Sequence, residues 1–112
     1  MSDCIFCKII EKKIPSKFVY EDDKVFAFED INPQAPVHIL IIPREHIADI
    51  TQVKDPGIIG QLYQAANKLA EEKGIKQTGY RLVINYGPHA GMAVHHLHLH
   101  LFGGRTLHWP PG

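Results

Sequence analysis

Hydrophobic and polar residues alternate with a period of two over several short stretches of this chain, a pattern typical of strands with one buried face. The polar residues 21–24 separate the first two stretches and predict a hairpin. A third stretch is almost wholly apolar and ends at Pro43, which indicates a buried strand. The predicted strands are Phe18 to Tyr20, Val25 to Phe28, Val37 to Ile42 and Arg81 to Tyr86.

One segment has the 3.6-residue period of an amphipathic helix instead. Asp55 and Pro56 suit an N-cap and a first helical position, and Gly74 suits a C-cap. A single long helix among several strands predicts an α+β fold with a mostly antiparallel sheet. No repeat or linker interrupts the pattern, so residues 1–112 are expected to form one domain. The apolar helix positions are Ile58, Ile59, Leu62, Tyr63, Ala66, Leu69 and Ala70.

The last alternating stretch, "HHLHLHLF" at 95–102, holds four of the eight histidines of the chain. On a strand, His96, His98 and His100 share one face, whereas His95 and the three leucines point the other way. Three imidazoles at this spacing can surround a small anion or a metal ion. Buried histidines satisfied by backbone carbonyls are the plainer alternative, which explains one lone histidine better than three in register.

Composition narrows the range of functions. A chain of 112 residues with 45% hydrophobic residues has room for one core. Its 12 basic and 12 acidic residues balance, which argues against binding to long nucleic acid or to an anionic membrane. The N-terminus lacks a signal-peptide pattern, and the longest aliphatic run, Ile39 to Ile42, is too short to cross a bilayer. We therefore expect a soluble, cytoplasmic protein.

The only two cysteines, Cys4 and Cys7, have the Cys-x-x-Cys spacing of half a metal site or of a redox pair. A redox pair of this kind follows a strand and begins a helix, but only three residues precede Cys4. A metal site is therefore the preferred interpretation.

Three segments resemble the HIT family of nucleotide hydrolases and transferases. "HLHLHLF" at 96–102 resembles its histidine triad signature, and "APVHILIIPREHI" at 35–47 resembles the segment that carries a further histidine. "GGRTLHWPPG" resembles the C-terminus of the Hint branch, the purine nucleoside phosphoramidases. The resemblance implies a single HIT domain at 1–112 with a Hint-like tail at 103–112. It also implies a homodimer, formed through the helix and a strand into one continuous sheet.

The same resemblance implies hydrolysis of nucleoside 5′-phosphoramidates to AMP or GMP. His98, the middle triad residue, is then the nucleophile at the α-phosphorus, and a neutral imidazole can act there near pH 7 without a metal. His96 and His100 are expected to orient the phosphate, and His38 to hydrogen-bond to them from a neighbouring strand. Taken alone, His38 is better explained as a satisfied core histidine.

The family pattern also places a nucleotide pocket. Asp30 matches the carboxylate that accepts hydrogen bonds from the ribose hydroxyls. Asn85 matches a position near the phosphate, although it also suits a turn. The residues that match the apolar base pocket, and that from spacing alone are plain core, are Phe6, Ile9, Phe28 and Ile31.

The loop before the triad departs from the family pattern. Met92 and Ala93 stand where the family usually carries polar side chains that assist the leaving group. The N–H groups of the loop, including the backbone at Ala93, still offer donors to a bound nucleotide. We therefore expect reduced activity toward poor leaving groups.

Some family members with an N-terminal Cys-x-x-Cys hold a structural zinc ion, and the residues that match its ligands are Cys4, Cys7, His46 and His95. Two thiolates and two imidazoles form a closed tetrahedral set, which suits holding the N-terminal segment in place rather than catalysis. Unligated buried thiols and two surface histidines are the alternative.

The tail carries the large apolar residues Leu107 and Trp109 on a segment without a core of its own. In Hint-like dimers the tail lies near the active site of the partner, which makes Trp109 a candidate nucleotide-binding residue. Two other functions remain open. One is a metal-dependent hydrolase that uses the triad as zinc ligands, and the other is a nucleotide-binding interaction module with weak turnover.

Overall fold

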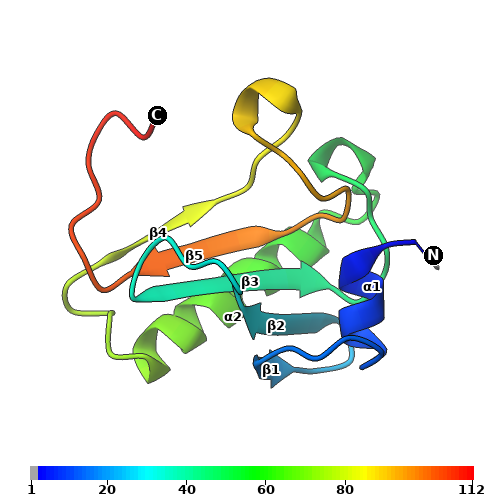
Figure 1. The fold of residues 1–112 in the computed structure, drawn as a ribbon, viewed down its shortest axis with the longest axis horizontal. Coiled ribbons are helices and arrows are strands. Elements are labelled where there is room, and N and C mark those ends of the chain that lie inside the picture. The colour runs from blue at the N-terminus through cyan, green and yellow to red at the C-terminus, as the bar shows by residue number, and fades with distance from the viewer. Residues whose placement is uncertain (1–2) are drawn as a thin grey trace.

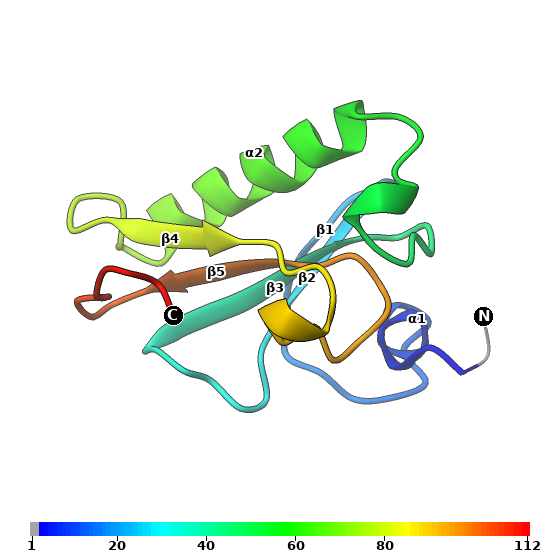
Figure 2. The ribbon, with the colours of Figure 1, turned by 90° about the horizontal axis from the view of Figure 1, so that it is seen from above.

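The computed structural model describes residues 3–112 and shows one five-stranded sheet with a long helix on one face and a short helix on the other (Figure 1 and Figure 2). Two short 3-10 helices lie at Ile50–Gln52 and Pro88–Ala90. The helices are α1 at Ile5–Ile10 and α2 at Gly57–Glu72. The strands are β1 at Phe18–Glu21, β2 at Val25–Glu29, β3 at Val37–Pro43, β4 at Tyr80–Val83 and β5 at Leu99–Gly103.

The strands lie in the order β1-β2-β3-β5-β4, and every neighbouring pair is antiparallel. The predicted α+β fold with an antiparallel sheet and one long helix is therefore confirmed. The last strand, β5, inserts between β3 and β4, and this order brings the end of the histidine stretch to the centre of the sheet. In the register of β3 and β5, Leu40 is opposite His100 and His38 is opposite Phe102.

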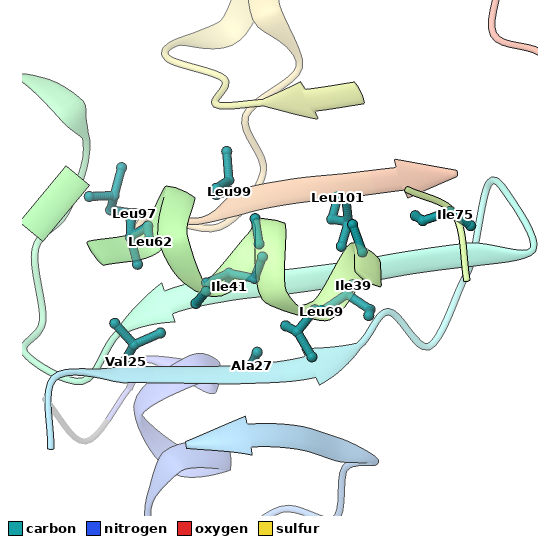
Figure 3. Packing of buried hydrophobic residues seen from close by; sticks show 13 residues of the cluster. Val25, Ala27, Ile39, Ile41, Leu62, Leu69, Ile75, Leu97, Leu99 and Leu101 are labelled. Carbon is teal, nitrogen blue, oxygen red and sulfur yellow. The ribbon is translucent and has the colours of Figure 1, made fainter. Parts of the chain in front are cut away.

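Odd-numbered residues of the central strands point toward α2 and form the main core. Figure 3 shows this layer, in which side chains of β2, β3 and β5 pack against Leu62 and Leu69 of the helix. Leu97, Leu99 and Leu101 belong to it and are buried, as their parity predicts. The other buried residues that the sheet contributes to this layer are Val25, Ala27, Ile39 and Ile41.

Even-numbered residues of the same strands point to the opposite face, where α1 lies (Figure 2). Phe6 and Ile9 of α1 pack there against Phe26, Phe28, Leu40 and Ile42 of the sheet. Helix α1 has no clear helical pattern in the sequence and was not predicted. Its Cys4 side chain accepts a hydrogen bond from the Cys7 N–H at 3.4 Å, as the N-cap of this single-turn helix. The short helix α1 covers only one end of the sheet, the end at which β3 finishes and β5 begins (Figure 1).

Helix α2 starts one residue later than predicted. The carboxylate of Asp55 accepts a hydrogen bond of 2.9 Å from the Gly57 N–H, which gives one of the free N–H groups of the first turn a partner. Gly74 has φ of +75°, a conformation that favours glycine, and it ends the helix as expected. No helix of residues 3–112 is long and apolar enough to cross a membrane.

Two predicted strand boundaries are wrong. The strand expected at 81–86 covers Tyr80–Val83, so Asn85 lies in the loop beyond it. The histidine strand was expected from His96, but β5 starts at Leu99. The residues before it run beside the segment that follows β3, where the Leu97 N–H donates to the Ile47 carbonyl at 2.7 Å. The side chains of His96, His98 and His100 therefore do not all stand on one regular strand.

Candidate active site and metal cluster

The active-site candidates gather on the sheet face opposite α2. His38 of β3 and His98 are buried, and His100 of β5 is partly exposed. The rings of His98 and His100 lie 5.0 Å apart between centroids, and those of His38 and His100 lie 5.2 Å apart. The strand order produces this arrangement, since β3 and β5 are far apart in the sequence but adjacent in the sheet.

His98 is held in one tautomer by the backbone. Its Nδ1 lies 2.7 Å from the carbonyl oxygen of His96, and because a carbonyl can only accept, Nδ1 carries the proton. The Nε2 atom of a neutral His98 therefore keeps its lone pair. Burial lowers the pKa of His98 below its ordinary value, so the neutral and nucleophilic form prevails at pH 7. The edge of the Phe6 ring packs on this imidazole, with centroids 5.2 Å apart.

His38 and His100 form a directed hydrogen-bond chain. The Gln34 N–H donates to His38 Nδ1 at 3.1 Å, so the proton of a neutral His38 is on Nε2. That Nε2 lies 2.9 Å from His100 Nδ1 and donates to it. His100 consequently carries its proton on Nε2, where it can donate to a phosphate oxygen. Burial is the main cause of a lowered pKa in both residues. The pKa of His38 falls below its ordinary value, and that of His100 falls to about 4.

Asp30 directly follows β2 and lies beside this chain of hydrogen bonds. Its Oδ1 accepts a 2.8 Å hydrogen bond from the Asn32 N–H, and its Oδ2 lies 3.5 Å from His38 Nε2. Asp30, His38 and His100 are close enough together to hold a metal ion. The hydrogen bond from the Gln34 N–H argues against a metal there. It occupies the Nδ1 lone pair of His38, so the proton of His38 is on Nε2, and Nε2 is the nitrogen that would have to bind the metal.

A second cluster lies where α1 meets the end of β3 and joins Cys4, Cys7, His46 and His96. One ligand atom from each of these side chains lies within 4.8 Å of all the others. His96 Nδ1 is 3.3 Å from Cys4 Sγ and 3.6 Å from Cys7 Sγ, and His46 Nδ1 is 3.4 Å from Cys7 Sγ. His96 Nε2 donates to the Pro43 carbonyl at 2.9 Å, so its Nδ1 lone pair faces the two sulfur atoms.

This donor set fits a tetrahedral metal ion. Two thiolates and two imidazole nitrogens are typical ligands of structural zinc. Burial, followed by the neighbouring Cys4, raises the pKa of the Cys7 thiol to about 11, so a bound cation is needed to keep it ionised at neutral pH. The described residues therefore bring together a set of ligand atoms that fits a metal ion.

Two expected roles need correction. The cluster contains His96 and not His95, which is exposed. The match to the ligand positions of the family was wrong by one residue, whereas parity held, since His96 and His98 both lie beside the Phe6 ring and His95 is exposed. His96 has no exposed surface, and its two ring nitrogens face Pro43 and the thiols, so its imidazole is not free to orient a phosphate. Only its carbonyl oxygen contacts the catalytic candidate His98.

The expected nucleotide pocket is only partly assembled in the single chain. Phe6, Ile9 and Phe28 are buried together in the cluster beneath α1. Ile31 is 100% exposed and Trp109 is 80% exposed, so neither contacts that cluster. Asn85 is partly buried in the loop after β4, and Ala93 is exposed in the loop before the triad.

Sequence reasoning missed the backbone groups that fix the histidine tautomers, namely the Gln34 N–H and the carbonyls of His96 and Pro43. Almost every residue has a backbone N–H and a carbonyl group, so the residue types in the sequence do not show which of these groups bind the histidines. The sequence did mark His96 as a possible ligand, because it is a histidine directly beside the predicted ligand His95.

The fold and site together define a histidine-triad protein, with a buried imidazole cluster at the centre of an antiparallel sheet. The model of the HIT domain matches residues 11–107, and the chain belongs to the HIT family. It is 49% identical to the 14 kDa zinc-binding protein of Brassica juncea, over 98% of this chain and 100% of that protein. It is 48% identical to adenylylsulfatase HINT1 of Arabidopsis thaliana, over 99% of this chain and 78% of that protein. A HIT family hydrolase from Legionella pneumophila Philadelphia 1 superposes with a TM-score of 0.94 at 48% identity, covering 98% of this chain and 100% of that one.

Proposed function

We propose that this protein hydrolyses nucleoside 5′-phosphoramidates and releases AMP or GMP through a covalent nucleotidyl-histidine at His98. The observation that carries the proposal is the fixed tautomer of His98, whose Nδ1–H donates to the His96 carbonyl at 2.7 Å. A neutral imidazole with its Nε2 lone pair free is a nucleophile, and its ordinary pKa of about 6.5 also makes it a good leaving group. Membership of a family with named hydrolases supports the reaction type.

The reaction has two displacements at one phosphorus. In the first, His98 Nε2 bonds to the α-phosphorus while the P–N bond to the amine breaks, and the amine leaves with a proton from the solvent. In the second, water attacks the same phosphorus, the bond to His98 breaks, and the nucleoside monophosphate leaves. The chain from Gln34 through His38 presents the Nε2–H of His100 to the phosphate oxygens. One such preorganised donor contributes about 3 kcal/mol in other enzymes.

The nucleoside is proposed to bind beside this centre. Asp30 is the ribose acceptor, and Phe6, Ile9, Phe28 and Ile31 enclose the base. Ile31, although fully exposed here, is covered when the base binds. Asn85 and the Ala93 backbone contact the phosphate side. The Ala93 side chain is exposed and apolar, so solvent water reaches the leaving group where the family usually has a polar side chain.

Zinc is proposed as a structural ion held by Cys4, Cys7, His46 and His96. The geometry of the ligand atoms supports it, and so does the name of the Brassica juncea relative, a zinc-binding protein. No step of the proposed reaction uses the ion. Two chains are proposed to form a cytoplasmic homodimer across the free edge strand β4 and α2, with Trp109 of each tail reaching the active site of the partner.

A quenched reaction tests the mechanism directly. Wild-type protein stopped during turnover of adenosine 5′-phosphoramidate should carry one adenylyl group on His98, located by mass spectrometry. Adenylyl sulfate belongs in the same assay, because an Arabidopsis thaliana relative is named for that activity and the attack on phosphorus would be the same.

His98→Ala tests the role of the nucleophile. The variant should bind AMP within about tenfold of wild type, since the ribose and base contacts remain, while turnover falls by about three orders of magnitude or more. Hydrolysis by His98→Ala at the wild-type rate, or an adduct on another residue, would contradict the mechanism. Tight AMP binding without turnover by the wild type would favour an interaction module instead.

A further inference from the structure

The loop at 30–36, between β2 and β3, carries a backbone group on which the proposed catalytic chain depends. The Gln34 N–H donates to His38 Nδ1 and so decides on which nitrogen His38 holds its proton. Residues 31–34 of this loop are exposed and Ala35 is buried, so burial anchors the loop after Gln34 but not at Gln34 itself. Asp30 is fixed independently, because its N–H donates to the His38 carbonyl at 3.0 Å, just beyond the last paired residues of β2 and β3.

Arg105, from the segment that follows β5, holds this loop. Its Nε and Nη2 both donate to the Gln34 carbonyl, at 3.1 and 3.0 Å, although the two residues are 71 positions apart. Its Nη1 donates to the Thr106 carbonyl at 3.0 Å, which orients the rest of the guanidinium group. Among residues 3–112, the side chains from outside the loop that hydrogen-bond to the backbone of 31–36 are those of Arg105 and of His38 itself.

The residue before Arg105 adds a second contact. Gly104 has φ of +89°, and a Cβ at this position would lie 2.9 Å from Pro36 Cβ. Only glycine allows the chain to turn here against the end of the loop. The segment after β5 therefore contacts the loop at Gln34 through Arg105 and at Pro36 through Gly104.

The tautomer of His38 has a consequence for the phosphate. If His38 instead carried its proton on Nδ1, its Nε2 would accept, and His100 would have to donate from Nδ1 to keep their hydrogen bond. His100 Nε2 would then hold a lone pair, which repels a phosphate oxygen instead of donating to it. The Gln34 N–H prevents this inversion.

We propose that Arg105 is a positioning residue of this enzyme, which fixes the Gln34 backbone so that His38 keeps its proton on Nε2 and His100 presents an N–H to the substrate phosphate. The effect of Arg105 on catalysis rests on the proposed function, whereas its effect on the tautomer of His38 does not. Arginine suits this role because two parallel donors on one planar group fix an oxygen in direction as well as distance. A lysine has one donor position and cannot reproduce the pair.

The test compares Arg105→Ala and Arg105→Lys with wild type, using full-length protein throughout. Arg44→Lys is the matched control, since Arg44, which follows β3, bonds to Glu21 of the edge strand β1 and is outside this chain of hydrogen bonds. Nitrogen-15 NMR of the imidazoles reports the tautomer of His38, and amide hydrogen exchange reports the Gln34 N–H. Kinetics with adenosine 5′-phosphoramidate give kcat and KM.

In Arg105→Ala we expect the Gln34 amide to exchange about tenfold faster and His38 to show a mixture of tautomers. We expect kcat to fall about threefold to tenfold with KM unchanged within about twofold, because Asp30 is held separately. Arg105→Lys should show the same changes at smaller size, and Arg44→Lys none of them. An unchanged His38 tautomer and Gln34 exchange in folded Arg105→Ala would overturn the proposal, as would an unchanged kcat. If the wild type hydrolyses no nucleotide, the proposed function fails, and the NMR and exchange results still decide the role of Arg105.

Discussion

At the scale of single residues, the site is defined by protons that backbone groups place on imidazoles. His98 donates to a carbonyl, His38 accepts from an N–H, and each choice leaves one ring nitrogen ready for a defined task. Burial keeps these rings neutral, and it lowers the pKa of His100 to about 4. The same burial that prepares the nucleophile therefore makes the folded protein sensitive to acid.

Stability should decrease as the pH falls below about 6.5, the ordinary pKa of histidine. Between this value and about 4 the unfolded chain binds a proton on His100 that the folded protein excludes, so protonation favours unfolding. The lowered pKa values of His38 and His98 act in the same direction. Urea unfolding of chelator-treated protein at several pH values measures the free energy, and His100→Asn should flatten its slope against pH. A free energy of unfolding that rises toward pH 5 would contradict this origin.

At the scale of elements, parity and period predicted most of the sheet and the long helix. The alternation of leucines with histidines correctly assigned Leu99 and Leu101 to the face against α2, because residues of one strand must alternate. The pattern could not show that β5 starts at Leu99, since the strand boundary depends on pairing with β3 and not on local residue type. The ligand prediction was wrong for a different reason, since the family match assigned His95 where the cluster contains its neighbour His96.

The helix α1 shows a different limit. Its six residues are too few for helical periodicity to be distinctive, and an isolated helix of this length is not stable. It forms because Phe6 and Ile9 pack on β2 and β3 and because its cysteines lie beside His46 and His96. Tertiary contacts of this kind could not be seen in the sequence, whereas the residue types for the metal cluster could.

Removal of the metal should loosen α1 and the segment before β5 together, since the four proposed ligands come from both and from the end of β3. We expect chelation to lower the Tm, and Cys4→Ser to lower it as well, because a ligand that binds only the folded state stabilises it. Zinc added back should restore the Tm of wild type but not fully that of Cys4→Ser.

Turnover should persist in chelated protein at temperatures where it stays folded, because His98 attacks phosphorus without a metal. Circular dichroism and elemental analysis establish folding and metal content in the same samples. Complete loss of turnover in folded, metal-free protein would contradict a purely structural ion and would favour a metal at the triad.

At the scale of the whole molecule, the sheet has two edge strands, β1 and β4. Within residues 3–112, strand β4 pairs with β5 alone, and the tail beyond Gly104 has no secondary structure. Arg81 of β4 donates to the His108 carbonyl at 3.0 Å and so holds the tail near this edge. Trp109 is 80% exposed, which is typical of a large apolar side chain that a second surface covers.

A truncated chain lacking residues 107–112 should fold with a Tm close to that of wild type, since the tail adds little to either core cluster. Its relative kcat/KM values for phosphoramidates with different leaving groups should change, because the truncation removes the proposed contact of Trp109 with the active site of the partner. Sedimentation should give twice the mass of one chain for both proteins, that is, twice 12.6 kDa for the full-length chain. Unchanged selectivity would show that the tail only packs on its own subunit.

Mixed dimers decide whether the tail acts on its own subunit or on the partner. A truncated subunit with intact His98 is combined, after unfolding and refolding together, with an excess of full-length His98→Ala subunits. Most of the truncated subunits then pair with a tail-bearing partner, and only the truncated subunits can react. If the tail acts across the dimer, the mixture should regain the leaving-group selectivity of the full-length enzyme, because each reactive site now borders the partner's tail. If the mixture keeps the selectivity of the truncated enzyme, the tail does not act in this way.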